Sequence, residues 1–272
     1  MTILEARGLS LGYGPDTIIE ALDVEIPANS VTVIVGPNGC GKSTLLRGLA
    51  GILPALRGEV LLAGRMLSSY RVAERARRLA FLPQSPLPPD GLTVEELVGR
   101  GRNPYRKPFG RWSRDDETVV RDAIAEAGME ALATCALNEL SGGQRQRAWL
   151  ALVLAQRTEV VLLDEPTTYL DIAHQIHVLD ICRSLHETRA RTVVAVLHDL
   201  NLACRYATHL IVMHDRRIVA QGPPAAVATV DLIRATFGVD CTIVADPLLG
   251  HPHIIPHRRT AGVDSAATGA SA

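Results

Sequence analysis

Residues 36–44 read Gly36-Pro37-Asn38-Gly39-Cys40-Gly41-Lys42-Ser43-Thr44, and this stretch decides the fold. It matches G-x-x-x-x-G-K-[ST], the pattern of a phosphate-binding loop. The preceding run, Val31–Val35, is β-branched throughout, as expected of a buried central strand, and Leu45–Ala50 after the loop has helical character. Glycines let the backbone wrap around phosphates, and the amide groups that begin the helix point at the anion. The sequence therefore predicts a nucleotide site between a strand and a helix.

The loop assigns distinct roles to its side chains. We expect Lys42 to reach the β- and γ-phosphates of ATP, and the hydroxyl of Ser43 to ligate Mg²⁺. The remaining residues that we expect to bind ATP from this loop are Gly36, Pro37, Asn38, Gly39, Cys40, Gly41 and Thr44.

Two further apolar runs end in chemically capable side chains. Val160–Leu163 runs into Asp164 and Glu165, and Val193–Leu197 runs into His198. Ligands of open α/β sheets bind at the carboxyl ends of the strands, so these residues are expected near the loop. We expect Asp164 to hold Mg²⁺ and Glu165 to polarise the attacking water.

Composition limits the class of protein. The hydrophobic fraction is 47% and the aromatic fraction 4%, so the apolar residues are mainly Leu, Val, Ile and Ala, which suits a buried parallel sheet. The formal net charge of −1 gives no basic excess for nucleic acid. No apolar run reaches 18 residues and no signal peptide is evident, so we expect a cytoplasmic chain.

The pattern along the chain predicts an α/β fold. Residues 1–35 indicate short strands, mostly antiparallel, and residues 57–82 more strand with a short basic helix. Residues 83–112 are rich in Pro, Gly and Arg and suggest a loop with short helices, whereas 115–135 has helical periodicity. Strands that alternate with helices predict a mostly parallel sheet with right-handed crossovers.

A third motif separates the classes of P-loop protein. The run Leu140-Ser141-Gly142-Gly143-Gln144-Arg145-Gln146-Arg147 resembles the signature of ABC ATPases. The resemblance extends from residue 3 to about residue 257. It implies one P-loop NTPase domain of the ABC type over residues 1–257, with a mostly parallel core sheet, an antiparallel β subdomain and a helical subdomain at about 85–150. We expect the small-residue tail, 258–272, to be disordered.

The remaining motifs of the family fall at matching positions. Tyr13 resembles the aromatic residue that stacks on adenine, and Gln84 resembles the Q-loop glutamine that binds ATP and Mg²⁺. His198 resembles the switch histidine that contacts the γ-phosphate, and Asp171 resembles the D-loop aspartate. The resemblance implies that the signature contacts the ATP of a partner copy through Ser141, Gly142, Gly143 and Gln144.

The family's mechanism implies partners. Two ATPase subunits would close on shared nucleotides as a homodimer and transmit that motion to integral membrane permease subunits. The chain would then lie at the cytoplasmic face of the membrane and act indirectly with a substrate-binding protein. The cofactors implied are ATP and Mg²⁺, and nucleic acid is not an expected partner.

Several details resemble importers of ferric siderophores. The run Asp164–Gln175, with Tyr169 where other ABC ATPases usually carry Ser or Asn, is close to that subgroup, as is His198-Asp199-Leu200-Asn201. An importer for haem, vitamin B12 or another small solute would share the same chemistry. An ABC protein acting on DNA or ribosomes usually has two cassettes, and a kinase would lack the signature, so both readings are disfavoured.

Overall fold

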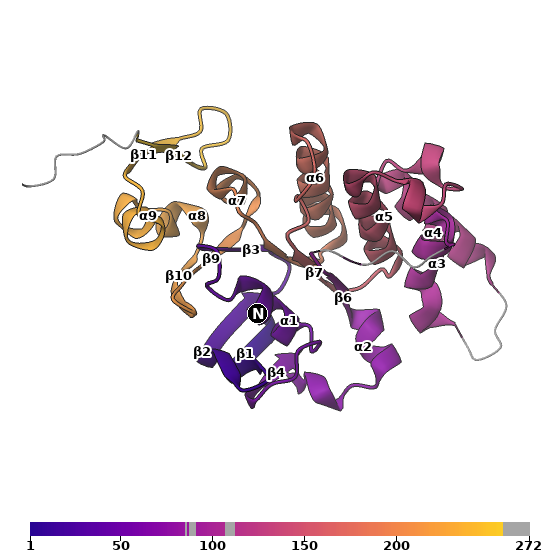
Figure 1. Cartoon of the computed structure of the whole chain (residues 1–272), viewed down its shortest axis with the longest axis horizontal. Helices are drawn as coiled ribbons and strands as arrows, with labels where there is room; N and C mark the ends of the chain where they lie inside the picture. The colour runs from indigo at the N-terminus through magenta and orange to yellow at the C-terminus, as the bar shows by residue number, and fades with distance from the viewer. Residues whose placement is uncertain (85, 87–90, 107–111, 258–272) are drawn as a thin grey trace, which may run out of the picture.

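The computed structural model describes residues 1–84, 86, 91–106 and 112–257 (Figure 1). The strands are β1 (Thr2–Tyr13), β2 (Asp16–Pro27), β3 (Val31–Val35), β4 (Arg57–Leu62), β5 (Arg65–Met66), β6 (Leu79–Leu82), β7 (Val160–Asp164), β8 (Thr192–Val196), β9 (His209–His214), β10 (Arg217–Gly222), β11 (Cys241–Ala245) and β12 (Pro252–Pro256). The helices are α1 (Lys42–Leu49), α2 (Val72–Arg78), α3 (Val94–Gly99), α4 (Arg114–Glu126), α5 (Gly142–Ala155), α6 (Ile172–Arg189), α7 (Leu200–Tyr206), α8 (Pro224–Val227) and α9 (Val230–Phe237). Short 3₁₀ helices are η1 (Leu67–Ser69), η2 (Arg100–Tyr105), η3 (Glu130–Leu132) and η4 (Leu137–Glu139).

A six-stranded sheet in the order β10-β9-β3-β8-β7-β6 forms the centre. The strands from β9 to β6 are mutually parallel, and only β10, at the edge, is antiparallel to its neighbour. Every residue of β3, β7 and β8 is buried. The predicted parallel sheet is confirmed, and β3, β7 and β8 are the three apolar runs found in the sequence.

Alternate residues of these strands face two different cores. Val33 and Leu163 pack in a cluster with residues of α4, α5 and α6, whereas Ile34 and Leu162 pack with α1 and the antiparallel strands. The sheet therefore lies in the middle of three layers, with helices on one side and the antiparallel sheet on the other (Figure 1). Burial on both faces explains why these strands are uniformly apolar rather than alternating.

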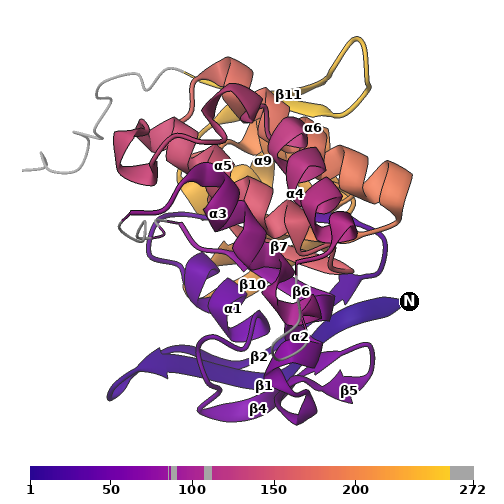
Figure 2. The same cartoon turned by 90° about the vertical axis from the view of Figure 1, so that its right-hand side faces the viewer.

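The antiparallel sheet, in the order β2-β1-β4-β5, carries α1 on its inner face (Figure 2). The sequence predicts antiparallel strands here, but short ones. Instead β1 and β2 are each 12 residues long and form one hairpin around residues 14–15. Register shifts along this pair mark bulges, which allow long strands to stay paired while they twist.

The helical part of the fold is built from α3, α4 and α5, which pack against one another. The predicted apolar face of α4, with Val119, Val120 and Ile124, is buried, as is Ala127 directly after the helix. Near the C-terminus, Asn201 of α7 bonds both backbone groups of Ile254 and holds the β11–β12 hairpin against α7. The tail at 258–272, expected to be disordered, lies outside the described residues. None of the helices described combines the length and the apolarity that a bilayer span requires.

Candidate nucleotide-binding site

The phosphate-binding loop forms a tight arch between β3 and α1. Gly41, at the start of α1, has φ 97, a left-handed conformation that favours glycine. A side chain at Gly36 would collide with the backbone oxygen of Met213, so β9 approaches the loop too closely for any other residue. The ammonium group of Lys42 donates to the carbonyl oxygens of Gly36 and Pro37, at 2.8 and 2.9 Å. The lysine thus lies across the arch, beside backbone amides suited to an anion.

Asp164 lies beneath this arch at the end of β7. The Ser43 hydroxyl donates to its Oδ1 at 2.7 Å, and its Oδ2 is buried with no hydrogen-bond partner. Arg47 approaches Oδ2 only to 3.8 Å, too far for a hydrogen bond. Burial raises the pKa of the Asp164 carboxyl, while the Ser43 bond and Arg47 oppose that shift. A buried carboxylate with one unsatisfied oxygen next to a hydroxyl suits a hard cation such as Mg²⁺.

Glu165 is held more firmly than any other acid of the site. Its Oε1 lies 2.7 Å from Nε2 of His198, and its Oε2 accepts from the Gln84 amide at 2.6 Å and from the Thr168 hydroxyl at 3.2 Å. The backbone of Glu165 has φ 54, an uncommon conformation for a residue with a side chain. The side chain is 8% exposed in the turn after β7. The arrangement fixes one carboxylate where the ends of β6, β7 and β8 meet.

Most of these groups, though not Gly36 or Asp164, line one cavity of 480 Å³, a volume typical of small-ligand sites. The predicted ATP and catalytic residues that line it are Tyr13, Asn38, Gly39, Gly41, Lys42, Ser43, Thr44, Gln84, Glu165 and His198. Ile18 also lines the cavity, although no motif indicated it.

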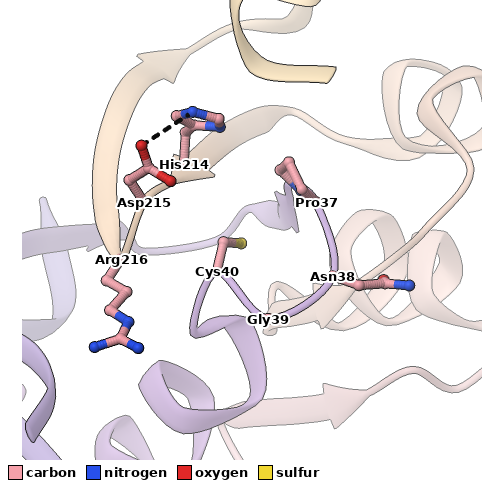
Figure 3. Close-up of a pocket in the computed structure, with 7 residues that line it drawn as sticks. All are labelled: Pro37, Asn38, Gly39, Cys40, His214, Asp215 and Arg216. Atoms are coloured by element: carbon pink, nitrogen blue, oxygen red, sulfur yellow. Dashed lines mark ion pairs between the residues drawn. The ribbon is translucent and has the colours of Figure 1, made fainter. Parts of the chain in front are cut away.

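The predicted loop residues Pro37 and Cys40 face a second, smaller cavity on the outer side of the arch. It measures 220 Å³ and is closed by the β9–β10 turn, with His214, Asp215 and Arg216 (Figure 3). Cys40 is 5% exposed, and burial raises the pKa of its thiol. The cysteine therefore packs behind the loop, away from the cavity lined by Lys42.

The signature residues do not join this cavity. Ser141 caps α5 by accepting from the Gln144 amide at 3.2 Å, and the Gln144 side chain accepts from the Ser141 amide at 2.8 Å. Gly143 instead lies against Tyr169 and Leu170, and Asp171 caps α6 through His174. Signature and D-loop are therefore neighbours of each other within one chain and are absent from that chain's own cavity.

Two polar residues of the site, in addition to Ile18, escaped the sequence analysis. Arg47 lies four residues after Ser43 on α1, where helical spacing could have indicated that both face Asp164. Thr168 returns to Glu165 through a turn in which its amide donates to the Glu165 carbonyl at 3.3 Å. The left-handed backbone of Glu165 brings this turn about, and no local pattern announces it.

A family model and several known proteins resemble this chain. The family model described as "ABC transporter" matches residues 19–168. The chain belongs to the ABC transporter family. It is an ATP-binding subunit and an ATPase, in agreement with the cavity that Lys42 and Glu165 line.

Similar proteins cover almost the whole of this ABC subunit. The "Probable siderophore transport system ATP-binding protein YusV" of Bacillus subtilis (strain 168) is 51% identical over 259 residues, 95% of this chain and 94% of that protein. The "Ferric enterobactin transport ATP-binding protein FepC" of Escherichia coli (strain K12) is 49% identical over 258 residues, 95% of each chain. The dimeric structure of a bacterial ABC transporter cassette has a TM-score of 0.74 at 25% identity, over 81% of this chain and 98% of that one.

Proposed function

We propose that this ABC subunit is the ATP-hydrolysing motor of an importer for ferric siderophores. The observation that supports the motor is the Glu165 carboxylate, held by Gln84, Thr168 and His198 at the cavity that Lys42 and Ser43 line. The support for the cargo is the function named for the relatives at about half identity.

The loop residues Gly36–Thr44 would bind the phosphates of ATP through backbone amides and Lys42. Tyr13, 45% exposed at the edge of the cavity, would stack on adenine. Ser43, Asp164 and Gln84 fit a Mg²⁺ ion. Asp164 offers a buried oxygen with no hydrogen-bond partner, and Gln84 donates to Glu165 through its amide nitrogen, so its amide oxygen would be the atom that ligates the ion. Bound Mg²⁺ would neutralise charge on the β- and γ-phosphates.

Glu165 would orient the attacking water and accept its proton. Three donors fix the direction of its carboxylate, so little reorganisation is needed when water binds. His198, which contacts Glu165 and is 48% exposed, would also reach the γ-phosphate at the cavity rim. Positioning and charge stabilisation account for most of the barrier reduction in phosphoryl transfer.

A second copy of the chain would complete the site. Ser141, Gly142, Gly143 and Gln144 are needed by the family's chemistry yet lie outside the cavity of their own chain, so they would contact the partner's ATP. The amide groups at the start of α5 would offer a second anion-binding helix end. Asp171, beside the signature, would lie at the same interface. The similar dimeric cassette supports this homodimer.

The motion of the dimer would drive integral membrane permease subunits from the cytoplasmic face of the membrane, with a substrate-binding protein delivering cargo on the other side. Nucleic acid remains an unexpected partner. Of the basic residues at 71–78, Arg75 and Arg77 bond to backbone carbonyls and Arg78 pairs with Glu159 at 2.7 Å, so these charges are largely engaged within the chain.

The decisive experiment measures uptake of radiolabelled ferric siderophore in cells that lack this chain, complemented with wild type, Glu165→Gln or Glu159→Gln. Glu159 begins the segment that leads into the same strand, is 57% exposed and serves as the matched control. We expect wild type and the control to restore uptake and Glu165→Gln to fail. Purified Glu165→Gln should still bind ATP while its turnover falls by about 10²-fold or more.

The outcomes separate motor from cargo. Full turnover in Glu165→Gln would contradict the catalytic role. Normal siderophore uptake in cells without the chain would contradict the siderophore cargo but not the ATPase activity. The same cells would then be tested for uptake of haem, vitamin B12 or another small solute.

A further inference from the structure

A third cavity lies at the opposite edge of the parallel sheet from the ATP site, where β7 and β8 begin. It measures 310 Å³, and three arginines line it: Arg157, Arg189 and Arg191. Its floor is apolar and comes from α4 and α5, which pack against each other (Figure 1). Arg191 and His198 bracket β8, so the sheet itself separates this cavity from the nucleotide site.

The ends of two helices bring these arginines together. Ala190 ends α6 in a left-handed conformation, with φ 49, and the Arg191 amide then donates to the Leu185 carbonyl at 3.0 Å. This closure turns the chain back toward the sheet and directs Arg191 into the cavity. Arg157, with φ 51, makes a similar reversal after α5. Two helix-ending turns thus converge on one space.

The charges in the cavity do not balance. Arg189 pairs with Glu126 at 3.0 Å, and Arg157 lies 3.8 Å from Asp122. Within the described part of the chain, the Arg191 guanidinium has neither a hydrogen bond nor an ion pair, and its Nη1 is buried. Burial lowers the pKa of Arg191, and Arg189 and Arg157 add to this effect, whereas the Glu126 carboxylate opposes it. Three cations therefore share two carboxylates, and the one without a partner is the most enclosed.

The carbonyl ends of helices α4, α5 and α6 also face this region and attract cations. Each helix end carries a partial charge of about half an elementary charge, and its effect falls off within one turn. These partial charges offset the excess positive charge of the three arginines, so the case for an anion rests on the hydrogen bonds that the buried Arg191 Nη1 lacks.

We propose that this cavity binds a compact oxyanion of the phosphate class, with Arg191 as its central donor and Arg157 and Arg189 beside it. A guanidinium fork matches the oxygens of phosphate and donates two parallel hydrogen bonds to them. Arg157 follows α5 of the helical part, whereas Arg191 directly precedes β8 of the core. The bound anion would therefore link the helical part to the parallel sheet.

The test uses thermal unfolding of the full chain in a Lys42→Ala background, which weakens phosphate binding at the nucleotide loop. Sodium phosphate is titrated against sodium chloride at equal ionic strength. We expect phosphate to raise Tm with the logarithm of its concentration once that exceeds the Kd, by about 5 °C at a hundredfold excess. Adding Arg191→Gln should abolish this rise. Arg121→Gln, on the exposed side of α4, is the matched control and should retain it.

A second arm distinguishes a free anion from a lipid headgroup. The same proteins are sedimented with vesicles of phosphatidylglycerol or of phosphatidylcholine. Binding to phosphatidylglycerol that Arg191→Gln removes would assign the phosphate to a lipid. The proposal is overturned if phosphate raises Tm equally in the proteins with and without Arg191→Gln. It is also overturned if phosphate raises the Tm of neither protein and both bind vesicles to the same extent. Arg191→Gln should remain folded, because it removes an unpaired and partly buried charge, and its Tm in chloride checks this directly.

Discussion

Asp164 carries its charge in a place that water hardly reaches. Its side chain is 0% exposed, and burial raises the pKa of the carboxyl. The folded chain therefore holds this proton more tightly than the unfolded chain does. As pH rises from the ordinary aspartate range through the raised pKa, Asp164 costs stability, and above that pKa the cost stays constant.

We therefore expect Asp164→Asn to raise the stability of the protein in chelator at pH 7. The amide keeps an acceptor for Ser43 and removes the desolvated charge, a gain of about 1 kcal/mol, or roughly 2–4 °C in Tm. Mg²⁺ with ATP should stabilise wild type and not the variant. Asp231→Asn, at 96% exposure, should change neither quantity. A lower Tm for Asp164→Asn in chelator would show that the ionised form is well compensated.

Cys40 belongs to the nucleotide loop and lines the smaller cavity, opposite His214 and Asp215 (Figure 3). Its sulfur is close enough to Gly36 that an added methyl group there would meet it. An alkyl group on this thiol would therefore deform the arch and block ATP binding, as the position of Cys40 in the motif suggests.

The environment of Cys40 also predicts that its thiol is alkylated slowly at neutral pH. Because burial raises the pKa of the thiol, the reactive thiolate is scarce at pH 7, and modification by iodoacetamide should accelerate up to pH values above the ordinary cysteine range. Mass spectrometry should show the more exposed Cys135 modified first and ATP slowing the reaction of Cys40. Retained ATPase activity after complete modification of Cys40 would refute the packing argument.

At the scale of elements, α4 and α5 each begin with a serine that forms a reciprocal pair of capping hydrogen bonds. The hydroxyls of Ser141 and Ser113 each accept a hydrogen bond from the amide three residues later, and the serine amides donate in return to the side chains of Gln144 and Asp116. We expect Ser141→Ala and Ser113→Ala to lower the free energy of unfolding by about 1 kcal/mol each. Only Ser141→Ala should also lower ATPase activity, because only α5 is expected to meet a partner's phosphate.

Urea unfolding and steady-state ATPase assays on the two variants would check this. Equal losses of activity would mean that Ser141 acts through helix stability alone.

Sequence reasoning succeeded where a motif is local. The buried strands, the loop and the carboxylates after β7 follow from β-branched runs and from the rule that ligands bind at the carboxyl ends of strands. It missed Thr168, which depends on the left-handed backbone of Glu165, and the arginine cavity, whose members come from different helix ends. The length of β1 was also missed, because bulges disturb the alternation that defines a strand.

At the scale of the whole molecule, the residues that we propose to act on one ATP lie in two separate places of the chain. The cavity that Lys42 lines lacks the signature, and the signature lies exposed beside the D-loop of its own chain. Two copies related by a two-fold axis would bring the cavity of each chain to the signature of the other. In such an interface, every contact from the first chain to the second is repeated from the second to the first. Specific ATPase activity should therefore rise with protein concentration until the dimer is saturated.

Mixing two inactive variants gives the sharpest form of this prediction. Lys42→Ala loses the loop and keeps the signature. Ser141→Asp keeps a side chain that caps helices well but adds a negative charge where the partner's γ-phosphate is expected. Each variant alone should be inactive. A one-to-one mixture would form half heterodimers, each with one intact loop facing one intact signature, so activity should return to about a quarter of wild type. A mixture as inactive as its components would mean that each chain uses its own signature or that both sites must be intact, and ATP-dependent dimer formation measured by light scattering would separate these two cases.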